Sequence, residues 1–279
     1  AGAAQVDLKG KYLVPGLVDA HVHFFQSGGL YTRPDAADLT RVRPYASEAA
    51  AIRADLPDTF RRYLVNGVTS VVDMGGPMWN FTVRAQSEAL EHAPRVAATG
   101  PLLSTVERTQ LGYADKEGEA PDLPIVRVET PESARAMVKE QLRQSPAFIK
   151  YWFVLSPERP FEQSLAILQA IVAEAHAGKT RVAVHANELE TARASVRAGC
   201  DVLVHSVWDK PVDDDFVRLL RDRNVTLIPT LVVLDGYAQA LGSPGGKPPS
   251  ELDRKWGAPG PLASWGEWSH VSTPEAREA

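Results

Sequence analysis

The stretch PGLVDAHVH, residues 15–23, decides the fold prediction for this chain. It ends a strand-like apolar run with two histidines, His21 and His23, spaced two residues apart. Side chains at i and i+2 of a strand point to the same side, so the two imidazoles can converge on one point. Neutral imidazole is a common metal ligand. An isolated pair is equally compatible with one histidine in the core and the other capping a loop.

Three more short apolar runs stop at a residue that can bind metal or be converted into a ligand. AFIK ends at Lys150, RVAVH ends at His185 and DVLVH ends at His205. In a (β/α)8 barrel, reactive groups lie at the C-terminal ends of the strands. The four strand ends therefore favour a metal site at the mouth of a parallel barrel.

Length and composition are those of a globular α/β domain. The chain has 279 residues, of which 44% are hydrophobic and 23% are charged, enough for one domain with a sizeable core. The net charge of -5 gives no indication of a nucleic-acid partner. The single cysteine, Cys200, excludes an intrachain disulfide and is predicted to be a core residue rather than a nucleophile.

No apolar run reaches the roughly 18 residues of a membrane span, and no signal peptide pattern opens the chain. We therefore expect a soluble protein without a membrane partner, and favour a cytoplasmic over an exported location. The sequence leaves a homo-oligomer open.

Alternating strand and helix patterns predict parallel βαβ units. The expected strands cover residues 17–23, 68–73, 95–99, 147–153, 181–185, 201–205 and 225–233. The expected helices cover residues 58–66, 131–142, 161–177, 189–198 and 213–223. Seven strands of a barrel are visible in the sequence.

Other segments interrupt this rhythm. Residues 25–56 and 101–129 follow the first and third strands, where they can form lids or substrate walls, or be surface insertions. Residues 242–261 contain ten glycines and prolines among twenty residues, which predicts an irregular loop or a flexible tail. Residues 273–279 resemble the start of a helix.

A family resemblance rests on three segments of the chain. They are the lead-in and first strand at 6–23, GVTSVVD at 67–73, and AGCDVLVHS at 198–206. They resemble the metal-dependent amidohydrolases, in particular the imidazolonepropionase-like and prolidase-like branch. The resemblance covers nearly all of the chain. It implies a (β/α)8 TIM-barrel-type hydrolase domain at residues 15–241, preceded by a remnant of a small β-sandwich at 1–14 and followed by a Gly/Pro-rich loop and partial helix at 242–279.

The resemblance also implies a ligand set. His21 and His23 would bind the more buried metal, and His185 and His205 a second one. Lys150, carboxylated by carbon dioxide, would bridge the two, and an ordinary lysine paired with an acid is the alternative. Zinc is the expected metal, one or two ions per chain, although other divalent ions suit these ligands.

The implied reaction is hydrolysis of a C–N bond in a small amide or dipeptide. Divalent metals would lower the pKa of a water and polarise the scissile carbonyl. Tyr151 is a candidate substrate contact, although strand alternation turns it away from the metals. A mononuclear deaminase of the same superfamily and a non-catalytic metal-binding barrel fragment stay open as alternatives. His92 and His176 are expected at the surface, and His270 has no evident partner.

The sequence departs from the family pattern in one respect. The family normally places an aspartate at the end of an eighth strand, where it binds metal and moves protons. No eighth strand is visible, and Asp235, just beyond the seventh, cannot replace it without changing the barrel. We therefore expect a chain truncated relative to a longer enzyme. Because an open barrel exposes sheet edges, we expect low stability and little hydrolase activity from this chain alone.

Overall fold

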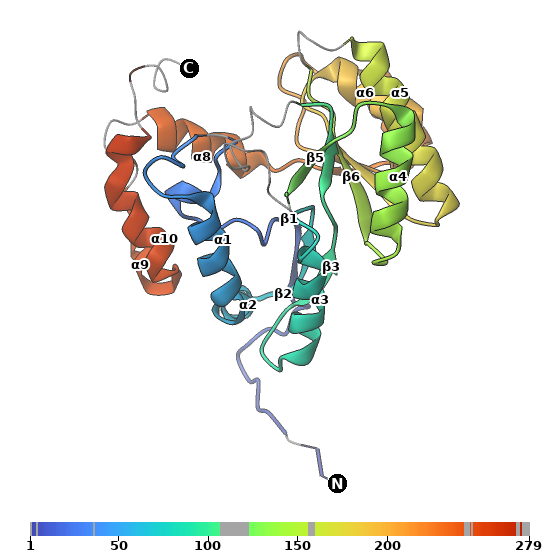
Figure 1. Ribbon diagram of the computed structural model, residues 1–279. Coiled ribbons are helices and arrows are strands. Elements are labelled where there is room, and N and C mark those ends of the chain that lie inside the picture. Colours follow the sequence, from blue (N-terminus) through green and yellow to red (C-terminus); the bar gives the residue numbers. More distant parts are fainter. Residues whose placement is uncertain are drawn as a thin grey trace.

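The computed structural model describes residues 2–3, 5–35, 37–106, 123–155, 160–242, 246, 248–271 and 274. Strands and helices alternate along most of its length (Figure 1). The strands are β1 (Leu17–Val22), β2 (Val68–Asp73), β3 (Arg95–Ala98), β4 (Leu102–Ser104), β5 (Ile125–Arg127), β6 (Phe148–Trp152), β7 (Arg181–His185), β8 (Val202–Val204) and β9 (Thr226–Ile228).

The helices lie between and after these strands. They are η1 (Leu30–Thr32), α1 (Tyr45–Ala54), α2 (Leu56–Val65), α3 (Asn80–Ala89), α4 (Pro131–Leu142), α5 (Phe161–Ala177), α6 (Leu189–Ala198), α7 (Asp214–Asp222), α8 (Leu231–Gly242), α9 (Glu251–Trp256), α10 (Pro259–Ser264) and η3 (Trp265–His270). None of the helices in the described part of the chain is long and apolar enough to cross a membrane.

All strand pairs are parallel, in the orders β1-β2-β3 and β5-β4-β6-β7-β8-β9. The Ala147 N–H donates to the Ala98 carbonyl at 2.8 Å, which joins the end of β3 to the start of β6. The seven expected strands therefore follow one another in chain order, as expected of a parallel barrel, with β4 and β5 as additions. Among the described residues, no strand pairs with the free edges of β1 and β9, so the barrel is open there.

The main hydrophobic core lies between β6–β8 and the helices α4 to α7, which gather on one side of that sheet (Figure 1). Ile149, Ile171 and Val184 are fully buried in it. A second core, centred on Phe60 and Val71, lies between β1–β3 and the helices α2 and α3. These two cores fix the strands from which the site residues project.

The end of the chain differs from the prediction. The expected strand at 225–233 is wrong beyond Ile228, because α8 begins at Leu231 and Thr230 has a positive φ of 46° that extended backbone does not adopt. The loop expected at 242–261 is also wrong in part, since it contains α9 and α10. Ser250 caps α9 in a capping box with Asp253, and Pro259 opens α10.

The two long loops and the two chain ends agree with the sequence predictions only in part. Residues 25–56 contain η1 and α1, and residues 101–129 contribute β4 and β5, with 107–122 outside the described residues. The described residues of 1–14 form no strand, and Tyr12 is 97% exposed where the N-terminus extends from the body (Figure 1). The expected helix at 273–279 lies outside the described residues apart from position 274.

Cys200 is buried and unpaired, as expected of a core residue. Burial raises the pKa of its thiol to about 12.

Candidate metal centre

Four histidines from three strand ends meet at the mouth of the open barrel. His21 and His23 leave β1, His185 ends β7, and His205 follows β8. The Nε2 atoms of His21 and His23 lie 3.0 Å apart. The ring centroids are 5.0 Å apart for His21 and His205, and 4.4 Å apart for His185 and His205. These four side chains and Lys150 of β6 all line one cavity of about 370 Å³.

Strand alternation explains how Lys150 reaches this cavity. Lys150 and Trp152 line the cavity, whereas Ile149 and Tyr151 are buried in the core toward the helices. Lys150 is 1% exposed, and no described acidic side chain forms an ion pair with it. The cavity therefore contains a buried lysine without the carboxylate partner that such a group normally requires.

Hydrogen bonds define the tautomers of two of these histidines. His23 Nδ1 lies 2.6 Å from the Gly75 carbonyl, so this nitrogen carries the proton and donates. His23 Nε2 then has a free lone pair, and His21 Nε2 donates to it. His21 Nδ1 is consequently an acceptor, and it is buried without a hydrogen-bond partner.

His205 occupies a strained backbone position. Its φ of 76° lies in the left-handed region, which costs about 1–2 kcal/mol for a residue with a Cβ. Its Nδ1 lies 2.6 Å from Thr230 Oγ1, and its N–H donates to the Ile228 carbonyl at 2.8 Å. Strain of this kind gathers at functional sites, where surrounding contacts maintain it.

All four imidazoles are held neutral. Burial, followed by the charge of Lys150, lowers the pKa of His23 to about 3 and that of His205 to about 3. Burial is also the largest cause that lowers the pKa of His21 and of His185. Burial lowers the pKa of Lys150 to about 7. Neutral imidazole is the metal-binding form, so the protonation state suits a cation.

The donor chemistry fits a divalent metal, although the side chains do not form a finished coordination shell. Among the described residues, no three histidine, cysteine, aspartate or glutamate side chains make up a ready metal group. The two Nε2 atoms at 3.0 Å are nevertheless close to the roughly 3.3 Å that two imidazoles of a tetrahedral zinc site require. The unpartnered His21 Nδ1 indicates that this histidine lacks its final partner here. Small ring rotations, with the His21 proton moved from Nε2 to Nδ1, would leave both Nε2 lone pairs free for a cation.

The rest of the cavity wall combines aromatic and polar side chains. Phe25, Trp152 and Trp208 line it together with Arg33 and Asp35, which are joined by hydrogen bonds of 2.7 and 2.8 Å. The Trp152 ring stands edge-on to His185, with 5.5 Å between the centroids. An apolar wall with a few polar groups is typical of a small-molecule pocket.

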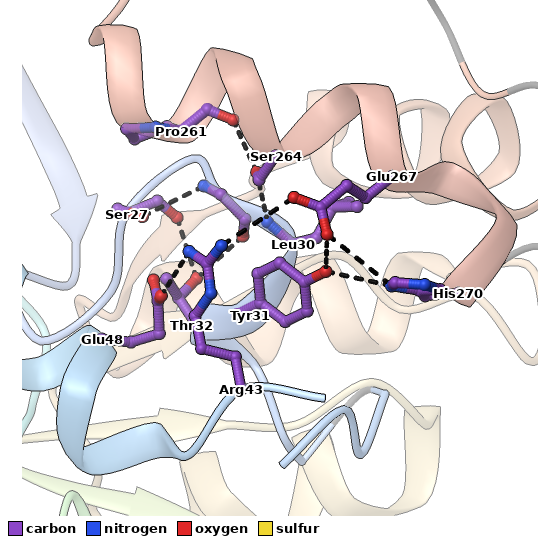
Figure 2. A network of polar contacts seen from close by, with 11 residues as sticks. Ser27, Leu30, Tyr31, Thr32, Arg43, Glu48, Pro261, Ser264, Glu267 and His270 are labelled. Atoms are coloured by element: carbon purple, nitrogen blue, oxygen red, sulfur yellow. Dashed lines mark hydrogen bonds and ion pairs between the residues drawn. The ribbon is translucent and has the colours of Figure 1, made fainter. Parts of the chain in front are cut away.

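Hydrogen bonds connect the loop that carries Phe25, Arg33 and Asp35 to the C-terminal helices α10 and η3. Figure 2 shows Tyr31 between Arg43 and the pair Glu267 and His270. The Tyr31 hydroxyl donates to Glu267 and lies 3.0 Å from His270 Nδ1, and Arg43 stacks 4.4 Å above the Tyr31 ring. Burial and the hydrogen bond to Glu267 raise the pKa of Tyr31 to about 12.

Backbone contacts extend this attachment. The Leu30 N–H donates to Ser264 Oγ at 3.0 Å, and Trp265 Nε1 donates to the Gly28 carbonyl at 2.7 Å. Of the alternatives left open for segment 25–56, a substrate wall agrees with this arrangement better than a surface insertion, because Phe25, Arg33 and Asp35 line the cavity. The expectation that His270 lacks a partner is wrong, because its Nδ1 lies 3.0 Å from the hydroxyl of Tyr31, in a loop more than 230 residues earlier, and 3.8 Å from Glu267.

Other candidates lie away from the cavity. Tyr151 is fully buried, its hydroxyl donates to the Ser164 carbonyl at 3.1 Å, and it does not line the cavity. The structure therefore does not bring it to the histidines. Asp235 is exposed on α8 and accepts a hydrogen bond from Gln239. His92 and His176 are exposed, as expected.

Sequence reasoning missed the residues that orient the histidines. Gly75 was detectable only as part of a Gly-Gly pair after the second strand, which indicates a tight turn but no partner. Thr230 was hidden in the strand predicted at 225–233. Arg33 and Asp35 lie in a loop whose path no periodic pattern reveals.

Comparison with known proteins supports the same architecture. The Amidohydrolase family matches residues 12–242. A crystal structure of an amidohydrolase is 26% identical, with a TM-score of 0.63 over 100% of this chain and 66% of that one. A prolidase complexed with N-methylphosphonate-L-proline is 23% identical, with a TM-score of 0.60 over 98% and 64%. The ochratoxinase of A. niger is 21% identical, with a TM-score of 0.62 over 92% and 58%.

These structures are longer than the chain, which spans 66% or less of their length. No curated protein matches it. The family match extends from before β1 to the end of α8 and includes all five residues of the cavity cluster. The chain belongs to the amidohydrolase family.

Proposed function

We propose that this chain carries the metal site of a hydrolase that cleaves an amide-type C–N bond in a small molecule. The observation that carries the proposal is the convergence of His21, His23, His185 and His205 with buried Lys150 on one cavity. The family match agrees with hydrolysis of this class of bond.

His21, His23, His185 and His205 would hold two divalent cations, most simply zinc. When bound, such metals lower the pKa of a water and polarise the scissile carbonyl. His23 and His205 present Nε2 because Gly75 and Thr230 engage their Nδ1 atoms. Partners of this kind fix the orientation of a ligand and increase its basicity.

Lys150 would supply the bridge as a carbamate. Its pKa of about 7 leaves a large fraction of the amine neutral near neutral pH. The Nζ lone pair attacks the carbon of carbon dioxide and forms an N–C bond. One C=O π bond opens and its electron pair moves onto oxygen, while one proton leaves the nitrogen to solvent. The product has one negative charge on two oxygens, which suits a site with two cations, whereas an ammonium would repel them.

The burial of Lys150 at the cavity favours this two-metal arrangement over a mononuclear deaminase, which would have no use for the lysine. The third possibility, a non-catalytic metal-binding fragment, predicts the same ligands without substrate recognition. Zinc content and the binding of a substrate analogue separate the three.

A small amide or dipeptide is the substrate class we propose. A cavity of about 370 Å³ lies at the small end of ligand pockets. The Phe25 and Trp152 rings would contact an apolar side chain or ring. The buried Asn187 Oδ1 has no partner and can accept a substrate N–H. Two similar structures, of a prolidase and of an Xaa-Pro dipeptidase with bound methionine, make Xaa-Pro dipeptides the first compounds to test.

Calorimetry with N-methylphosphonate-L-proline tests this proposal without requiring turnover. The protein reconstituted with zinc and bicarbonate should bind the phosphonate at least tenfold more tightly than the zinc-free protein. His185→Asn should abolish the difference, whereas the matched surface variant His176→Asn should retain it. Equal affinity with and without zinc would contradict the proposal. Zinc binding without any phosphonate binding would support the non-catalytic fragment.

A further inference from the structure

The last residue of β2, Asp73, is a buried carboxylate that contacts the backbone N–H of Phe24, the residue that follows His23. Asp73 is fully buried and pairs in register with Val22 of β1. No described basic side chain forms an ion pair with it. A buried carboxylate of this kind is expensive to maintain, so its contacts indicate what it does.

The Asp73 carboxylate joins three segments of the chain. Its Oδ1 accepts the Gly75 N–H at 3.1 Å. Its Oδ2 accepts Asn80 Nδ2 at 2.8 Å and the Phe24 N–H at 3.4 Å. One side chain thus connects the residue after His23, the turn after β2 and the first residue of α3.

The Gly75 peptide transmits this arrangement to His23. Gly75 has a φ of 129°, a conformation that side chains rarely adopt, and a Cβ there would lie 2.7 Å from Leu102 Cδ1. Its N–H is held by Asp73 while its carbonyl accepts His23 Nδ1 at 2.6 Å. Two further backbone bonds, Met74 N–H to the Val22 carbonyl and Gly76 N–H to the Gly100 carbonyl, fix the turn on both sides.

We propose that Asp73 is a positioning residue for His23. By holding the Gly75 turn and the Phe24 backbone, it keeps the His23 imidazole in the Nδ1–H tautomer with Nε2 toward the cavity. The inference rests on the proposed function for what Nε2 binds, but the tautomer is a property of the metal-free protein.

Long-range ¹⁵N–¹H correlation spectra of the metal-free protein test the inference. In the unaltered protein His23 should be the Nδ1–H tautomer. Asp73→Asn is nearly isosteric but places an NH₂ donor against the Gly75, Phe24 or Asn80 donors. It should give a tautomer mixture at His23 and weaken zinc binding by about 10–100-fold.

Ser87→Ala is the matched control. It removes another buried hydrogen bond of α3, to the Pro94 carbonyl, without touching Gly75. Its His23 spectrum and zinc affinity should be unchanged.

The outcomes separate this inference from the proposed function. An Nε2–H tautomer at His23 in the unaltered protein would overturn the inference without any variant. An unchanged tautomer and zinc affinity in Asp73→Asn would also overturn it. If the unaltered protein binds no zinc but His23 shows the expected tautomer, lost in Asp73→Asn, the proposed function fails and the inference stands.

Discussion

The half of the molecule around β6–β8 and the C-terminal segment 251–270 are held by different forces. In the first, Ile149, Ile171 and Val184 are fully buried between the sheet and the helices. In the second, α9 and η3 bury no side chain and α10 buries only Ser264. The segment is attached through polar contacts to the loop after β1 (Figure 2). Apolar burial therefore fixes the strands of Lys150, His185 and His205, while polar contacts hold the wall loop opposite them.

The largest expected effect is acid lability of the metal-free protein. A histidine whose pKa is lowered from 6.5 to about 3, such as His23 or His205, binds its proton mainly when unfolded. Stability is therefore present above pH 6.5 and falls with pH below it. At pH 5 His23 and His205 should each cost about 2 kcal/mol, and His21 and His185, whose pKa values burial also lowers, should act in the same direction. Asp73, whose pKa burial raises, should offset part of this loss.

Urea unfolding at pH 7 and pH 5 measures this loss. His205→Asn should reduce the difference in unfolding free energy between pH 7 and pH 5 by about 2 kcal/mol, the contribution of that one histidine. The surface variant His92→Asn should leave it unchanged. Equal unfolding midpoints at the two pH values would show that these histidines are not held neutral.

The second effect is a stabilising substitution at the candidate bridge. Burial lowers the pKa of Lys150 from 10.5 to about 7, so at pH 7 this lysine destabilises the folded metal-free state. Lys150→Met should increase the free energy of unfolding by on the order of 4 kcal/mol, whereas Lys9→Met in the exposed N-terminal segment should change it little. Denaturant unfolding measures both, and destabilisation by Lys150→Met would indicate a partner for the amine.

A third pair of variants compares the two regions directly. Ile171→Ala removes a fully buried side chain of α5 and should cost about 3 kcal/mol. Leu252→Ala on α9, where the side chain is 68% exposed, should change stability by less than about 0.5 kcal/mol. Similar losses for the two would remove the distinction between the regions.

The smallest expected effect is local. Tyr31→Phe removes the hydroxyl that contacts Glu267 and His270, worth about 1 kcal/mol. Amide exchange in residues 259–270 should accelerate about fivefold, with exchange in β6–β8 unchanged. Tyr12→Phe, at an exposed tyrosine, serves as the control. Unchanged exchange in 259–270 would mean that this contact does not hold the segment.

The same contrast explains what could be predicted from the sequence. The strands that carry Lys150 and His185, and the strand that His205 follows, were predictable, because buried parallel strands leave apolar runs bounded by helix stop signals. Lys150 is the third residue of β6 and does not end it, as the AFIK run had suggested. The run after Ile228 is apolar too, but periodicity does not separate a short strand from a helix there. The contact of Tyr31 with Glu267 was not predictable, because polar contacts between distant segments leave no periodic trace.

In the candidate site, the histidines and the lysine could be predicted from the sequence, whereas the contacts that orient them could not. The proposed ligands could be picked out because each lies in or directly after a strand-like apolar run, and His21 and His23 are two residues apart. Their orientation depends on Gly75 and Thr230, which meet them only in the folded chain. Tyr151 shows the value of alternation, since the structure turns it toward the helices as the pattern implied.

The central claim is that side chains carried by the four strands β1, β6, β7 and β8 form one metal centre. The most direct measurement is elemental analysis of the chain after loading with zinc and bicarbonate and removal of loosely bound metal. The account predicts two zinc ions per chain, with a lower number in Lys150→Met. No bound zinc in the folded protein, or the same number in both proteins, would contradict it.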